Sequence, residues 1–162
     1  MKDLIKFTKF FPTAKTVADL SKDPSTKVGA IALDEDYNIL VVGYNGFPRK
    51  VVDSADLYAN RDIKYQRIVH AEMNIVAQAA SMGVSLKGCT VLITSLHPCS
   101  ICTRLLIQAG VKQIIVGELK KISPLWQMHW EASKPLLKEA QIPVYEWDGK
   151  ELTLILGEEN GN

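Results

Sequence analysis

The chain has 162 residues, of which 47% are hydrophobic, and its formal net charge is +1. This length fits one domain over residues 1–162 with a sizeable core, and we expect residues 157–162 to form a frayed tail. The balanced charge argues against a nucleic-acid-binding protein that relies on a broad basic surface. No segment approaches the roughly 20 apolar residues of a membrane-spanning helix, and the N-terminus lacks a signal-peptide pattern. With only three cysteines, we expect a cytoplasmic protein without structural disulfides.

Hydrophobic periodicity and turn signals predict alternating helices and strands. A hairpin followed by βαβ units predicts an α/β fold of three layers (α/β/α), with a five-stranded mixed sheet and helices on both faces. In the last helix, Trp126 and Trp130 are one turn apart, and we expect both to pack against the sheet. The predicted helices cover residues 12–22, 68–82, 99–109 and 124–140, and the predicted strands cover residues 27–33, 38–44, 89–94, 112–116 and 144–147, with a further short strand at 151–156.

The segment from Tyr44 to about Gln66 is predicted to be irregular. It opens with the turn signal Asn45-Gly46, yet no evident strand follows to complete a hairpin. Irregular loops longer than about 12 residues within a domain are usually functional or disordered. We therefore expect this segment to form part of a binding cleft.

Two short motifs carry the chemistry of the chain. His70-Ala71-Glu72 is followed, after a gap of 25 residues, by Pro98-Cys99-Ser100-Ile101-Cys102, which gives the pattern H-x-E…P-C-x-x-C. One imidazole nitrogen and two thiolates suit Zn²⁺, and three protein ligands leave a tetrahedral site open to water, as in catalytic zinc sites. We therefore predict one catalytic Zn²⁺ held by His70, Cys99 and Cys102, with Glu72 as the residue that moves protons.

Other interpretations of the C-x-x-C pair explain less of the sequence. A structural zinc ribbon needs a second ligand pair, whereas the remaining cysteine is Cys89, which we expect to be a buried core thiol. A redox C-x-x-C leaves His70 and Glu72 without a role. Both halves of the motif open predicted helices, whose N-termini favour thiolates and leave N–H groups near Ala71 for a pyrimidine carbonyl oxygen.

The combined pattern is the signature of zinc nucleobase deaminases. In that chemistry Zn²⁺ lowers the pKa of bound water from about 15.7 to roughly 7, which makes hydroxide available to attack C4 of cytosine. Glu72 is expected to take the water proton, to deliver a proton to ring N3 and to help the amino group leave as ammonia.

The chain resembles the cytidine and deoxycytidylate deaminase superfamily, and most closely its deoxycytidylate (dCMP) deaminases. The resemblance implies a cytidine-deaminase-like fold and zinc-dependent hydrolysis of dCMP to dUMP and ammonia, which supplies dUMP for thymidylate synthesis. It also implies a homo-oligomer, often a hexamer, that acts on a small-molecule nucleotide. The stretches that carry the resemblance are residues 23–30, 43–49, 69–74 and 94–102.

The resemblance also implies roles for individual residues. Asn45 matches the family residue that hydrogen-bonds the sugar, and the Ala71 N–H is implied to meet the pyrimidine O2. Ser25, Lys27 and Arg49 are our candidates for contacts to the phosphate.

The chain departs from the family pattern in the loop at residues 117–121. Many regulated dCMP deaminases carry an aromatic-Arg pair there, which binds the phosphate and responds to triphosphate effectors, whereas this loop reads Gly-Glu-Leu-Lys-Lys. Lys120 and Lys121 are the candidate substitutes, although lysine lacks the bidentate fork of arginine. The loop histidine motif that some phage and eukaryotic members use for a second zinc is also missing.

Because of these departures, other substrates remain open. Cytidine, deoxycytidine, dCTP and 5-methyl-dCMP are the alternatives within the same chemistry. A tRNA adenosine deaminase is disfavoured by the near-neutral charge and by the Asn45-Gly46-Phe47-Pro48 stretch. The non-enzyme alternative is a zinc-stabilised binding module, against which Glu72 argues because a structural site needs no carboxylate beside the metal.

Overall fold

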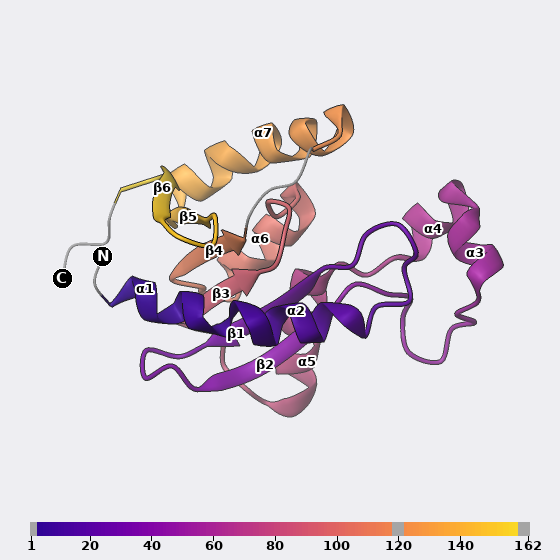
Figure 1. The fold of residues 1–162 in the computed structure, drawn as a ribbon, viewed down its shortest axis with the longest axis horizontal. Coiled ribbons are helices and arrows are strands. Elements are labelled where there is room, and N and C mark those ends of the chain that lie inside the picture. Colours follow the sequence, from indigo (N-terminus) through magenta and orange to yellow (C-terminus); the bar gives the residue numbers. More distant parts are fainter. Residues whose placement is uncertain (1–2, 118–121, 159–162) are drawn as a thin grey trace.

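The computed structural model describes residues 3–117 and 122–158, which form a mixed sheet of six strands between two layers of helices (Figure 1). The strand order is β2-β1-β3-β4-β5-β6. β1 pairs antiparallel with β2 and with β3, the strands β3, β4 and β5 run parallel, and β6 returns antiparallel to β5. The strands are β1 (Gly29–Leu33), β2 (Ile39–Tyr44), β3 (Thr90–Ile93), β4 (Gln113–Gly117), β5 (Val144–Trp147) and β6 (Leu152–Leu156).

The helices divide between the two faces of the sheet, so the predicted three-layer α/β/α fold is confirmed. α1, the 3₁₀ turn η1 and α2 cover one face, and α5, α6 and α7 cover the other, while α3 and α4 lie beyond one end of the sheet (Figure 1). Among the described residues, no helix is long and apolar enough to cross a bilayer. The bounds are α1 (Leu4–Phe7), η1 (Thr8–Phe10), α2 (Phe11–Asp19), α3 (Ala55–Ala59), α4 (Arg61–Arg67), α5 (Ala71–Met82), α6 (Ser100–Gln108) and α7 (Pro124–Glu139).

Alternate strand residues enter two separate hydrophobic clusters, one on each face. In β1, Ala30 and Ala32 join the cluster that contains residues of α5, α6 and α7. Ile31 and Leu33 join the cluster that contains Phe11 of α2. Because successive strand side chains point to opposite faces, both faces of the central strands are apolar.

Some predicted boundaries were wrong. The sheet has six strands rather than five, because β6 pairs along its length with β5. The first helical layer begins at Leu4 instead of residue 12, as α1 and η1 precede α2. Of the predicted frayed tail, residues 159–162 lie outside the described part of the chain.

The segment that was predicted to be irregular contains two helices, α3 and α4. Asn60 caps α4, since its side-chain oxygen accepts a hydrogen bond from the Ile63 N–H at 3.2 Å. Tyr58 of α3 is buried and stacks on Phe47, with ring centroids 4.2 Å apart. Helices of five and seven residues are too short to show a clear hydrophobic period, which is why the sequence pattern missed them.

Close packing of α2 on β1 depends on Gly29. A Cβ at this position would meet the Ala14 carbonyl oxygen and would lie 2.8 Å from the Ala18 nitrogen. We expect Gly29→Ala to lower the free energy of unfolding by about 1–3 kcal/mol, as overpacked cores do, which chemical denaturation would measure. Gly46→Ala is the control, because the nearest atom to its new Cβ is the Tyr58 hydroxyl oxygen at 3.8 Å. Equal stability of Gly29→Ala and wild type would contradict this account of the α2–β1 contact.

Candidate metal centre and active site

The two motif halves meet where two helices begin. His70 is the N-cap residue of α5, and Cys99 is the N-cap residue of α6. Both have extended backbone, with φ near −70° and ψ of 157° and 165°, as is usual for N-caps. Cys102 lies in the first turn of α6, so the sequence prediction placed the three residues correctly at helix starts.

The three predicted ligand atoms are close enough to share one ion. Nδ1 of His70 lies 3.5 Å from Sγ of Cys99 and 3.4 Å from Sγ of Cys102. All three ligand atoms lie within 4.8 Å of one another. A tetrahedral Zn²⁺ with bonds of about 2.3 Å to sulfur and about 2.0 Å to nitrogen separates these atoms by about 3.6 Å. The donor set and its spacing therefore fit Zn²⁺.

The electrostatics of the two thiols favour a thiolate at Cys99. A hydrogen bond from the Cys102 thiol lowers the pKa of Cys99, against the opposing effect of burial, and His70 contributes in the same direction. The same hydrogen bond raises the pKa of Cys102, because one proton lies between the two sulfurs. Backbone N–H groups of Met73 and Cys102, at the two helix starts, favour the thiolate forms. Metal binding displaces thiol protons, so both sulfurs would bind Zn²⁺ as thiolates.

Glu72 lies beside the candidate ligands in the first turn of α5. Its side chain is buried, with 4% of the residue exposed. Burial raises the pKa of Glu72, and the neighbouring His70 opposes that shift only in part. A buried carboxyl with a raised pKa holds a proton more readily than a free carboxyl does, which suits a residue that accepts a proton and passes it on.

Helix α7 adds an aromatic side chain that the sequence prediction assigned elsewhere. Trp130 is buried in the core cluster, as expected, and stacks on His97. Trp126 instead is half-buried, with its ring centroid 5.6 Å from that of His70. Its Nε1 donates a hydrogen bond to the His97 carbonyl oxygen at 3.1 Å, which holds the indole at the metal centre. No local signal reveals this contact, because it depends on where α7 crosses the sheet.

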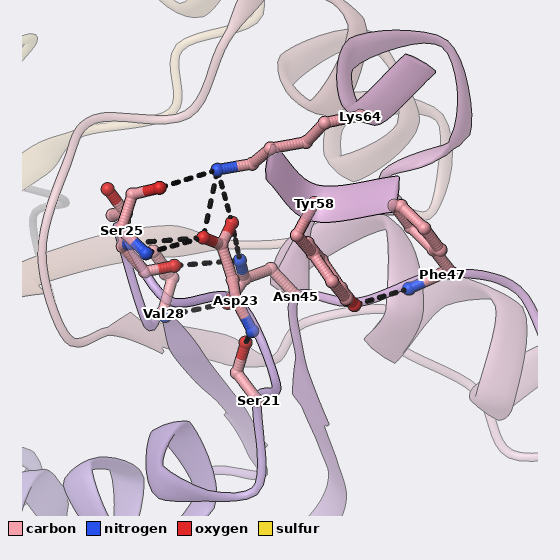
Figure 2. A network of polar contacts seen from close by, with 9 residues as sticks. Ser21, Asp23, Ser25, Val28, Asn45, Phe47, Tyr58 and Lys64 are labelled. Carbon is pink, nitrogen blue, oxygen red and sulfur yellow. Dashed lines mark hydrogen bonds and ion pairs between the residues drawn. The ribbon is translucent and has the colours of Figure 1, made fainter. Parts of the chain in front are cut away.

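Asn45 follows β2 and is buried in a polar network (Figure 2). Its Oδ1 accepts the Val28 N–H at 2.8 Å, and its Nδ2 donates to the Thr26 carbonyl oxygen at 2.9 Å. The Asn45 amide therefore holds the loop at residues 23–28, which also carries the candidate Ser25. Sequence reasoning missed this connection.

The other predicted contact residues lie in different surroundings. Ala71 is fully buried at the first position of α5, where a backbone N–H has no intrahelical acceptor. The exposed Lys27 donates from Nζ to the Asp19 carbonyl oxygen at 3.2 Å. The exposed Arg49 lines a recess with Asn74 and Gln78 of α5. Lys120 and Lys121 lie outside the described residues.

A mixed α/β sheet with a His-Cys-Cys centre beside a buried glutamate is typical of zinc-dependent nucleobase deaminases. Residues 5–118 match the family described as cytidine and deoxycytidylate deaminase zinc-binding region. The chain therefore belongs to the cytidine and deoxycytidylate deaminase family.

Within this family, the chain is similar to several deoxycytidylate deaminases. A probable deoxycytidylate deaminase of Caenorhabditis elegans is 38% identical over 144 residues, which cover 87% of this chain and 69% of the worm protein. The deoxycytidylate deaminase of Mus musculus is 37% identical over 121 residues, covering 70% of this chain and 65% of the mouse protein. The dCMP deaminase of cyanophage S-TIM5, solved with dCMP and dUMP, is 26% identical with a TM-score of 0.68, and the match covers 90% of this chain and 98% of that one.

The geometry predicts that the Cys99 thiol is needed to bind the metal and that the Cys89 thiol is not. We expect Cys99→Ala to lower zinc content from about one ion per chain to near zero, because two remaining ligands hold Zn²⁺ poorly. Elemental analysis after dialysis measures this. Cys89→Ala is the matched control, since Cys89 is also buried but is not part of the candidate ligand group, and it should keep its zinc. Full zinc occupancy in Cys99→Ala would refute the ligand role.

Proposed function

We propose that this protein catalyses the zinc-dependent hydrolytic deamination of dCMP to dUMP and ammonia. The observation that carries the proposal is the buried Glu72 carboxyl next to a His-Cys-Cys group whose spacing fits Zn²⁺. The named relatives from worm and mouse support deoxycytidylate as the substrate, as does the similar phage enzyme that binds dCMP and dUMP. Cytidine, deoxycytidine, dCTP and 5-methyl-dCMP are the alternatives that a direct assay must separate.

In this mechanism His70, Cys99 and Cys102 would hold Zn²⁺, which would supply hydroxide at neutral pH by lowering the pKa of water to about 7. Glu72 carries protons: its carboxylate takes one from water, and the resulting carboxylic acid donates it to N3 of the cytosine ring. Burial raises the pKa of Glu72, which helps the carboxyl to keep the proton between the two transfers. As the first proton leaves, the water oxygen forms a bond to C4. Glu72 then carries the proton of the new C4 hydroxyl to the amino group, the C4–N bond breaks, and ammonia and dUMP are released. The Ala71 N–H is our candidate donor to the pyrimidine O2.

The remaining substrate contacts that we propose are made by residues in loops. Asn45 Oδ1 uses one lone pair for the Val28 N–H, so a second lone pair can accept a hydrogen bond from a sugar hydroxyl. Ser25, Lys27 and Arg49 are exposed and are our candidates for the phosphate. For the cellular context, we infer a cytoplasmic homo-oligomer, such as a hexamer, that supplies dUMP in pyrimidine metabolism and acts on free nucleotides rather than nucleic acid.

Glu72→Gln separates a catalytic from a structural role. The amide keeps the size of the side chain but carries no proton between water and ring, so we expect bound zinc to stay and turnover to fall by about 10²–10⁴-fold. Ammonia release and zinc content, measured on the same preparation, check both parts. Glu139→Gln, at the exposed end of α7, is the matched control and should keep full activity. Unchanged turnover in Glu72→Gln would remove Glu72 from the mechanism.

A parallel substrate assay tests the proposed function directly. The zinc-loaded protein would be given dCMP, dCTP, deoxycytidine, cytidine and 5-methyl-dCMP, and ammonia release would be followed. We expect kcat/KM to be highest for dCMP by at least about tenfold, which corresponds to about one good charged contact to the phosphate. A preference for a nucleoside would overturn the phosphate assignments but keep the zinc chemistry. No activity on any substrate would favour the binding module.

A further inference from the structure

A buried ion pair connects α4 to the loop at residues 23–28 (Figure 2). The Lys64 Nζ lies 2.7 Å from Oδ2 and 2.8 Å from Oδ1 of Asp23, so the ammonium contacts both carboxylate oxygens. The side chains are 11% and 2% exposed, respectively. The two residues are 41 positions apart in the chain, so the contact joins segments that local structure does not hold together.

The same two side chains hold both Ser25 and Asn45. Asp23 Oδ1 accepts the Ser25 N–H at 2.8 Å, and Oδ2 accepts the Asn45 Nδ2–H at 3.3 Å. Lys64 Nζ donates to Ser25 Oγ at 3.2 Å (Figure 2). The pair therefore sets the direction of the Ser25 hydroxyl and one contact of the Asn45 amide, the candidate contacts to phosphate and sugar.

The pair also lies close in the chain to the metal centre. Lys64 precedes His70 by six residues. Between them, Val69 exchanges two backbone hydrogen bonds with Gly46, at 2.8 and 3.1 Å, next to Asn45. Movement of α4 would therefore displace both the loop that carries Ser25 and the start of α5.

The energetics of a buried ion pair indicate that Asp23 and Lys64 fix the geometry of the loop rather than stabilise the fold. Removing two opposite charges from water costs free energy that their attraction often only balances, so a buried pair is a poor source of stability. Burial raises the pKa of Asp23, but hydrogen bonds from Lys64, Ser25 and Thr26 outweigh it, so the pKa lies below its ordinary value. The carboxylate is therefore charged at neutral pH. A charged, fully hydrogen-bonded centre fixes direction more strictly than apolar packing does.

We propose that Asp23 and Lys64 are positioning residues that orient Ser25 and Asn45 for the phosphate and sugar of the nucleotide. The inference rests on the proposed function, because it concerns the substrate of that site. Neither residue acts on the reacting atoms.

The test compares Lys64→Met with the double variant Asp23→Asn/Lys64→Met, assayed below the melting temperature of each. In Lys64→Met we expect KM for dCMP to rise about tenfold or more, the value of one lost charged hydrogen bond, while kcat changes less than about threefold and zinc stays bound. The double variant removes the unpaired buried carboxylate and should recover thermal stability, whereas its KM should stay raised. If KM returned to the wild-type value together with stability, the pair would be structural only and the proposal would fail.

Lys22→Met is the matched control. Lys22, next to Asp23, forms an ion pair with Asp53, just before α3, at 3.1 Å, and the two side chains are 67% and 27% exposed. Because surface pairs contribute little, this variant should keep the wild-type KM. An equal rise of KM in Lys22→Met would assign the effect to general loosening of the segment and overturn the proposal.

Amide hydrogen exchange keeps the two proposals separate. The Val28 N–H is held by Asn45 Oδ1, so its exchange reports on the loop without any substrate. We expect at least about tenfold faster exchange in Lys64→Met, and wild-type exchange in Lys22→Met. Wild-type protein that is inactive on dCMP would overturn the proposed function alone. Unchanged Val28 exchange in Lys64→Met would overturn the positioning role whatever the activity.

Discussion

The site depends on the meeting of two helix N-termini within a few ångströms. α5 and α6 begin at His70 and Cys99, and their first turns bring one imidazole nitrogen within 3.5 Å of two sulfurs. Hydrogen bonds link these atoms, and positive charge close by favours the thiolate forms that bind a metal. The partial charge of two helix starts supplies part of it, and Zn²⁺ supplies the rest when it binds. The role of the sheet in the site is to hold these two helix starts in place.

The third helix on that face, α7, keeps the cysteine loop in position. Ser133 Oγ donates to the Pro98 carbonyl oxygen at 2.8 Å, and Trp126 Nε1 donates to the carbonyl oxygen of His97. The His97 ring itself stacks on Trp130 at a centroid distance of 3.9 Å, and burial, with help from Lys134, lowers its pKa to about 4. His97 is therefore neutral at physiological pH. Its ring packs between α7 and the cysteine loop and adds no positive charge beside the metal centre.

On the substrate side, a polar centre takes the place of apolar packing. The loop at residues 23–28 has its polar backbone held by Asp23 and Asn45, with Lys64 closing the network from α4. Such a network is satisfied only when all its members are present, so it favours one loop conformation. In the proposed function, this preformed network presents Ser25 and Asn45 to the nucleotide, whereas the loop at residues 117–121 reads Gly-Glu-Leu-Lys-Lys.

The sequence alone determined the α/β fold and placed the candidate zinc ligands and Glu72 at helix starts, because these features follow from short-range patterns: hydrophobic periodicity, helix start signals and the C-x-x-C spacing. The two helices after β2, α3 and α4, were not predicted because they are too short to show a hydrophobic period. Tertiary structure alone decided that Trp126 lies beside His70 and that Lys64 reaches Asp23. These contacts join segments far apart in the chain, and a single lysine or tryptophan has no local pattern. Their partners are set by strand order and helix placement, which the folded core determines.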